Sequence, residues 1–294
     1  MQPTRYWLNP LAIIATATLF LGTPALANET NSITIESDQV QEEEIIEIEV
    51  TPPDINPSGA CAASIEPIIN NIIGRYQNNW GILVEKLEDR TLLYNHNADK
   101  YFIPASNNKI FTTAAALQRL NPYSKIGSKS LQNWVNVTNI RSNNYYADTL
   151  LRHIGGPNAA KAALAQLGVN PNSFRQVDGS GLSRNNIATP RALVETLRAM
   201  YYSPARDMFY SSLPIAGITG TLTNRMKRTS AQGTVSAKTG TLRGVRALSG
   251  YVNHPQLGLL VFSILANNSN VSGSALVGSI DKMVLQLSAF QPCN

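Results

Sequence analysis

The segment TVSAKTGTLRGVRALSGYVNHPQLGLLVFSILAN, residues 234–267, decides the fold because it holds three strand-like runs in close succession. The runs are residues 234–239, 246–252 and 258–267, and turn residues separate them. A helical pattern follows from about Ala275 to Phe290. The C-terminal part of the chain therefore predicts three neighbouring strands and a closing helix.

The N-terminal side of the folded region complements this arrangement. Isoleucines at positions 65, 68, 69, 72 and 73 give one apolar helical face, which predicts a helix over residues 64–78. Residues 80–87 and 91–95 then read as a β-hairpin. The order of elements favours an α+β fold, in which an antiparallel sheet has its first and last helices on one face.

The middle of the chain is predicted to be mostly helical. A helix from Asn107 to about Leu120 ends before Pro122, and residues 142–168 form two helices that break at the Gly155-Gly156-Pro157 sequence. A further helix begins at Pro190, with Thr189 as its N-cap. These helices form an α-rich part inserted into the sheet.

The first 27 residues have the pattern of a cleaved secretory signal. Arg5 precedes a charge-free apolar run from Leu11 to Leu21, and the small-residue sequence Ala25-Leu26-Ala27 follows. The run is short for a membrane span of about 20 residues. We therefore expect an exported protein that is secreted, periplasmic or associated with a cell wall, with no stable membrane span after signal cleavage.

The rest of the chain consists of an acidic segment followed by a basic one. Residues 28–60 carry nine acidic side chains and no lysine or arginine, which predicts a disordered acidic linker. Residues 61–294 carry 23 basic and ten acidic side chains, a net charge of +13, and form the predicted folded domain. Such a surface suits a polyanion, but export argues against nucleic acid as the partner.

The chain has two cysteines, Cys61 and Cys293, near the two ends of this basic region. In an oxidising compartment two lone cysteines predict a disulfide. The predicted bond would bring the two ends of the domain together.

Ser106 and Lys109 are the first candidates for chemistry. They lie three residues apart at the start of a helix, within PASNNKIFTTAAAL (residues 104–117), so the amine can reach the hydroxyl. The three histidines (His96, His153 and His254) form neither a triad pattern nor a metal site, so a serine nucleophile here would need a base other than histidine, and Lys109 is the candidate. A capping serine beside a solvated lysine is the alternative.

Two further motifs favour the catalytic interpretation. Ser142 and Asn144 open the next helix with a Ser-x-Asn pattern, and Lys238-Thr239-Gly240 lies in one of the predicted strands. Together with Ser-x-x-Lys, in this order, these motifs resemble the active site of the penicillin-recognising serine enzymes. Longer blocks across about residues 64–290 resemble the class C penicillin-binding proteins of peptidase family S13, the D-alanyl-D-alanine carboxypeptidases and endopeptidases: PASNNKIFTTAAAL, SNNYYADTLLRHIGG, VDGSGLSRNNIATP, LPIAGITGTLTNRM and VSAKTGTLRGVRALSGYV.

This resemblance implies a β-lactamase/transpeptidase-like fold and a role for each motif residue. It implies catalytic roles for Ser106 as nucleophile, Lys109 as base and Ser142 as proton relay. It implies substrate-binding roles for Asn144, Lys238, Thr239, Gly240 and Thr241. The implied partners are peptidoglycan stem peptides, with β-lactam antibiotics as covalent inhibitors and with no metal or organic cofactor.

The sequence also departs from the family pattern. Only 36 residues separate Ser106 from Ser142, so the bulky domains that the family usually inserts there are missing and the helical subdomain is reduced. Two alternatives to the carboxypeptidase remain open: a wall-binding module with a relic site, and a β-lactamase. An endopeptidase activity would use the same residues.

Two other motifs have no assigned role. Residues 219–222 repeat the TGTL sequence of residues 239–242 but have Ile218 in place of the lysine. Residues 178–181, DGSG, predict a tight glycine turn near the site.

Overall fold

The computed structural model describes residues 65–291. The predicted signal peptide, the acidic linker and both cysteines of the predicted disulfide, Cys61 and Cys293, lie outside the described residues. The helices and strands are α1 (Glu66–Ile73), the 3₁₀ turn η1 (Gly74–Asn79), β1 (Trp80–Lys86), β2 (Leu92–His96), η2 (Ala105–Asn107), α2 (Asn108–Arg119), β3 (Lys125–Ile126), β4 (Lys129–Ser130), α3 (Leu131–Ile140), α4 (Asn144–His153), α5 (Gly156–Gln166), β5 (Phe174–Arg175), β6 (Ile187–Ala188), α6 (Pro190–Tyr201), α7 (Arg206–Tyr210), η3 (Gly220–Leu222), β7 (Val235–Leu242), β8 (Val245–His254), β9 (Gly258–Asn267) and α8 (Gly273–Ala289).

The main sheet has five strands in the order β2-β1-β9-β8-β7, and each neighbouring pair is antiparallel. This arrangement confirms the predicted hairpin and the three C-terminal strands. The register places Lys238 of β7 opposite Ser249 of β8, and Ser249 opposite Ser263 of β9. In this sheet β7 is an edge strand, so one side of the Lys238 segment is left without a neighbouring strand of the sheet.

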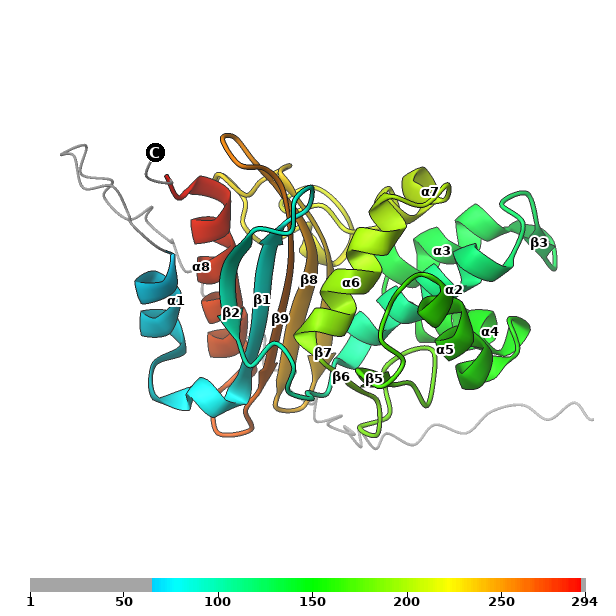
Figure 1. Ribbon diagram of the computed structural model, residues 1–294, viewed down its shortest axis with the longest axis horizontal. Helices are drawn as coiled ribbons and strands as arrows, with labels where there is room; N and C mark the ends of the chain where they lie inside the picture. The colour runs from blue at the N-terminus through cyan, green and yellow to red at the C-terminus, as the bar shows by residue number, and fades with distance from the viewer. Residues whose placement is uncertain (1–64, 292–294) are drawn as a thin grey trace, which may run out of the picture. The chain divides into compact units, whose positions relative to one another are not determined.

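Helices cover both faces of the sheet (Figure 1). On one face α1 and α8 pack side by side, as predicted, and Ile82 and Val84 of β1 contact their hydrophobic cluster. Leu83, between them in the sequence, joins the cluster on the opposite face under α2 and α6. Because strand side chains alternate between faces, the apolar residues of β1 serve both cores.

The helical part, α2 to α7, contains two helices that the sequence did not predict, α3 and the short α7. A short connection was expected between α2 and the helix at Ser142, but α3 occupies ten residues of it. The Ser130 side chain caps α3 by accepting the Asn133 N–H, and Leu131 and Val135 are fully buried. As a result α2 is enclosed by helices and by the sheet, and its first ten residues, Asn108–Leu117, are all buried.

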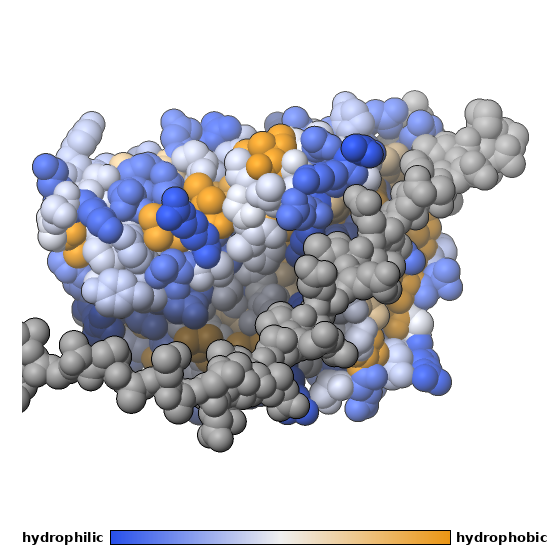
Figure 2. Space-filling model, turned by 180° about the vertical axis from the view of Figure 1, so that it is seen from behind, coloured by the Kyte–Doolittle hydropathy of each residue, from blue (hydrophilic) through white to orange (hydrophobic). Residues whose placement is uncertain are grey.

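The surface of the described part is mixed in character. Figure 2 shows hydrophobic residues in separate groups among hydrophilic ones on the face opposite that of Figure 1. Within residues 65–291 no helix combines the length and the apolar character that crossing a bilayer needs.

Candidate active site

Ser106 lies in η2, the 3₁₀ turn that leads into α2. The turn is packed tightly between two glycines. A Cβ on Gly181 would lie 1.9 Å from the Ala105 carbonyl oxygen, and a Cβ on Gly240 would lie 2.7 Å from that of Pro104. Ala105 itself has a left-handed φ of 47°. The close packing and the unusual backbone fix the position of the Ser106 hydroxyl.

Lys109, one turn further along α2, is fully buried. Its Nζ contacts three oxygen atoms: Ser106 Oγ at 3.0 Å, Asn144 Oδ1 at 2.7 Å and the Ser180 carbonyl oxygen at 2.6 Å. The predicted serine–lysine pair is therefore in hydrogen-bond contact, and Asn144 joins it. An exposed lysine that merely follows a capping serine does not fit this arrangement.

Burial lowers the pKa of Lys109 from 10.5 to about 8, because a low-dielectric surrounding disfavours the ammonium form. The negative charges of Asp148 and Asp178 act in the opposite direction and raise this pKa. Burial, and not the charge of a second amine, is the largest of the causes that act on this pKa.

Lys238, on β7, is also fully buried. Its Nζ donates to Ser142 Oγ at 2.8 Å and to the Thr239 carbonyl oxygen at 2.9 Å. Burial lowers its pKa well below the usual value, and the positive charge of Lys109 lowers it further. Ser142, whose φ of 52° is left-handed, therefore lies beside a second lysine whose ammonium form is disfavoured.

Thr239 and Thr241 occupy the open edge of β7. Thr239 is half-buried and Thr241 is exposed. The Thr239 hydroxyl donates to the Thr221 hydroxyl at 2.7 Å. Thr221 belongs to the TGTL repeat that had no assigned role in the sequence, so the structure brings both copies of the repeat to one place.

The DGSG turn also lies at the site, as predicted, and it contributes a contact that the sequence did not show. Its Ser180 carbonyl accepts from Lys109. Asp148 of α4 accepts hydrogen bonds from the turn's backbone. A signal for Asp148 was present, because it follows Asn144 by four residues and so shares its helix face.

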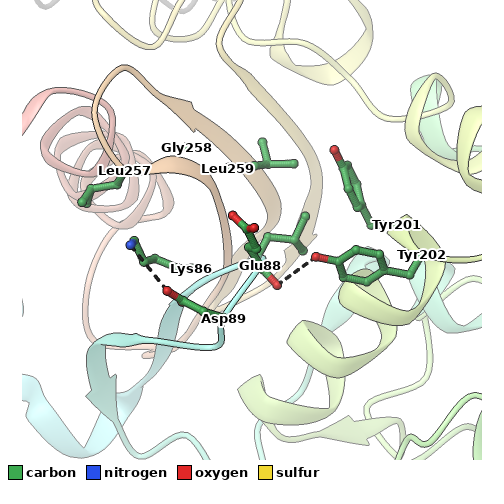
Figure 3. Close-up of a pocket in the computed structure, with 9 residues that line it drawn as sticks. Lys86, Glu88, Asp89, Tyr201, Tyr202, Leu257, Gly258 and Leu259 are labelled. Carbon is green, nitrogen blue, oxygen red and sulfur yellow. Dashed lines mark hydrogen bonds and ion pairs between the residues drawn. The ribbon is translucent and has the colours of Figure 1, made fainter.

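A separate cavity of about 320 Å³ lies between the β1–β2 hairpin, the β8–β9 hairpin and the end of α6 (Figure 3). It contains none of the motif residues. Much of its polar lining is already paired: Lys86 Nζ lies 3.6 Å from Asp89 Oδ2, and the Tyr202 hydroxyl lies 3.4 Å from the Leu87 carbonyl oxygen. The motif residues of the described part gather around Ser106, Lys109 and Lys238 instead.

The order of the motifs and their assembly at one site agree with comparisons to known proteins. Residues 62–133 and 122–289 match the D-Ala-D-Ala carboxypeptidase 3 (S13) family. The chain belongs to this family. The match extends over most of the sequence, which confirms the predicted family.

Curated relatives support this assignment. The chain is 37% identical over 183 residues to penicillin-sensitive carboxypeptidase A of Dictyostelium discoideum, covering 55% of this chain and 35% of that protein. It is 39% identical over 165 residues to the D-alanyl-D-alanine carboxypeptidase of an Actinomadura species, covering 51% of this chain and 30% of that protein. The chain thus spans about a third of the length of these relatives.

Solved structures confirm the fold. Penicillin-binding protein 4 of Haemophilus influenzae matches with a TM-score of 0.66 at 14% identity, covering 77% of this chain and all of that one. A class A β-lactamase from Clostridium kluyveri matches with a TM-score of 0.61 at 17% identity, covering 76% and 98%. The β-lactamase/transpeptidase-like fold predicted from the motifs is therefore correct.

Proposed function

We propose that this protein is a serine D-Ala-D-Ala carboxypeptidase that cleaves peptidoglycan stem peptides through an acyl-enzyme on Ser106. One observation carries the proposal: Ser106 Oγ lies 3.0 Å from Nζ of a lysine that has no solvent exposure. Family membership supports the same reaction class.

Acylation begins when Ser106 Oγ attacks the carbonyl carbon of the penultimate D-Ala and Lys109 accepts the hydroxyl proton. With a pKa of about 8, roughly a tenth of Lys109 is neutral at pH 7. An exposed lysine would be neutral in fewer than about one molecule in a thousand. Burial thus supplies a usable base without a histidine.

The negative charge that develops on the substrate oxygen needs donors. We assign this role to the backbone N–H groups of Ser106 and Thr241, which belong to the tight η2 turn and to the edge strand β7. Loss of one such donor typically lowers the rate by about 100- to 1000-fold. Gly240 allows η2 and β7 to approach closely, since a Cβ there would lie 2.7 Å from the Pro104 carbonyl oxygen.

The leaving group needs a proton, and Ser142 is placed to relay it. Its hydroxyl accepts a hydrogen bond from Lys238 Nζ at 2.8 Å, and Lys238 keeps its own proton. The proton that Lys109 took from Ser106 passes through Ser142 to the D-Ala amine, which returns Lys109 to its neutral form. Lys238 and Thr239 bind the terminal carboxylate of the substrate. The carboxylate raises the lowered pKa of Lys238 on binding, because an adjacent negative charge favours the ammonium form. Asn144 orients Lys109 and binds the substrate amide, and water then releases the acyl group.

The same machinery would cleave crosslinks as an endopeptidase, and β-lactams would acylate Ser106 as covalent inhibitors. The proposal also covers the domain organisation: a signal peptide over residues 1–27, an acidic linker over 28–60 and a hydrolase domain over 61–294. It includes a Cys61–Cys293 disulfide and a location in the periplasm or cell wall. Relatives named as bacterial carboxypeptidases support an envelope location. The net charge of the domain favours an anionic wall polymer.

A fluorescent penicillin tests the proposal directly. Wild-type protein should form a persistent adduct on Ser106 that mass spectrometry locates, and the Ser106→Ala variant should form none. Release of D-Ala from a peptide ending in D-Ala-D-Ala should accompany labelling. A folded protein that is never labelled would favour the wall-binding module, and rapid turnover of the penicillin would favour a β-lactamase.

A further inference from the structure

The DGSG turn is held against α4 by one carboxylate. Asp148 Oδ1 accepts the backbone N–H groups of Gly179 and Ser180, both at 2.9 Å. The contact is tight, since a Cβ on Gly179 would lie 2.3 Å from the Ala147 carbonyl oxygen. One aspartate thus fixes two successive peptide groups of the turn.

The turn is also anchored to α2, but by neutral groups. Asn108 Nδ2 donates to the Asp178 carbonyl oxygen at 2.6 Å, and Thr112 Oγ1 donates to that of Gly179 at 2.8 Å. The Ser180 carbonyl, which faces Lys109, belongs to the next peptide group, and Asp178 Oδ1 accepts the Gly181 N–H of that group at 2.5 Å. The orientation of this carbonyl therefore depends directly on Asp178, and on Asp148 through the two peptide groups that precede it.

The direction of the Ser180 carbonyl matters because of the donor count of an amine. A neutral lysine amine has two N–H donors and one lone pair, whereas the ammonium has three donors. If Asn144 Oδ1 and the Ser180 carbonyl accept the two N–H groups, the lone pair is left for Ser106 Oγ. Transfer of the Ser106 proton then produces an ammonium whose three donors all have acceptors.

We propose that Asp148 is a positioning residue, which fixes the Ser180 carbonyl and thereby aims the lone pair of neutral Lys109 at the Ser106 hydroxyl. This inference rests on the proposed function. Asp148 touches neither the substrate nor the reacting atoms, and it acts through the turn.

The charges around Lys109 give the loss of Asp148 a measurable effect on the pH dependence of acylation. Asp148 on α4 and Asp178 in the turn raise the pKa of Lys109. Lys238 on β7 carries the other charge near Lys109, and the two amines repel each other. Removing the charge of Asp148 should therefore lower the pKa of the base. A carboxylate too far from Lys109 to interact with its charge would not shift the pH at which acylation is lost.

The test compares Asp148→Ala with Asp148→Asn in the full-length protein, using a fluorescent penicillin. Alanine removes the acceptor of both N–H groups, and we expect the acylation rate constant at saturating ligand to fall about 10- to 100-fold. The non-covalent binding constant should stay near the wild-type value, because Asp148 lies outside the ligand contacts. Asparagine keeps an oxygen acceptor, so its maximal rate should stay within about threefold of wild type, with its acid limb moved to lower pH.

Asp207→Asn is the control, since Asp207 is an exposed aspartate on α7 and its loss should change neither quantity. An unchanged maximal rate in Asp148→Ala would overturn the inference, as would an Asp148→Asn variant that is as slow as the alanine variant. If Asp148→Ala does not fold, Asp148→Asn decides: a shifted acid limb supports the inference and an unshifted limb refutes it. A wild-type protein that is not labelled would overturn the proposed function as well.

Discussion

The acylation rate should depend steeply on pH between 6 and 9, because the proposed base, Lys109, is a buried lysine. Burial places the pKa of Lys109 at about 8. The amine is then about nine-tenths neutral at pH 9, about a tenth neutral at pH 7 and about a hundredth neutral at pH 6. Since only the neutral form accepts the Ser106 proton, the rate should fall roughly tenfold from its plateau to pH 7 and tenfold again to pH 6.

The measurement is the second-order rate constant for labelling by a fluorescent penicillin at each pH, with circular dichroism to verify that the protein stays folded. The constant should also fall at high pH, because Lys238 has a lowered pKa and loses the charge that binds the ligand carboxylate. Labelling at saturating ligand should reduce this second decline, since the bound carboxylate holds the proton on Lys238. A rate constant at saturating ligand that is unchanged from pH 6 to 9, or that rises only above pH 10, would show that Lys109 is not the base.

Two substitutions test other parts of the site. Thr221→Val removes the hydroxyl that is hydrogen-bonded to Thr239, and labelling by a carboxylate-bearing penicillin should slow about tenfold, the value of one hydrogen bond. Thr221→Ser keeps a hydroxyl and should be labelled at the wild-type rate. Equal labelling rates for the valine and serine variants would contradict a role for Thr221. Gly181→Ala places a Cβ 1.9 Å from the Ala105 carbonyl oxygen and should lower the melting temperature and abolish labelling. Gly168→Ala is its matched control, because Gly168 has nearly the same φ (85° against 84°) but open space around it, so only the conformational cost of about 1 kcal/mol should remain. Similar losses in both variants would mean that the contact with η2 is unimportant.

Local sequence predicted most of the elements. The helix that carries Lys109 was expected over residues 107–120 and is observed over 108–119. The three C-terminal strands were expected within a few residues of their observed bounds, because apolar runs between turn residues specify strands locally. The first helix is shorter than expected, since Gly74, with a φ of 52°, ends it after Ile73.

The site was predicted less completely. Ser106 and Lys109 could be paired from sequence because a helix brings residues three apart together. The other contacts of Lys109 come from Asn144 and from Ser180, which follow it by 35 and 71 residues. Motif resemblance suggested the first of these, and nothing in the sequence indicated that a backbone carbonyl would be the second.

The sequence by itself determined that Ser106 and Lys109 lie within reach of each other at the start of one helix, and which strand carries Lys238. Helical and strand periodicity act over a few residues, so both features can be predicted locally. Only the tertiary structure decided that both amines are buried, and therefore what their pKa values are. Desolvation depends on how completely neighbouring groups exclude water, and here those groups come from α2, α4, the DGSG turn and β7. Packing between segments so distant along the chain has no local pattern from which it could be predicted.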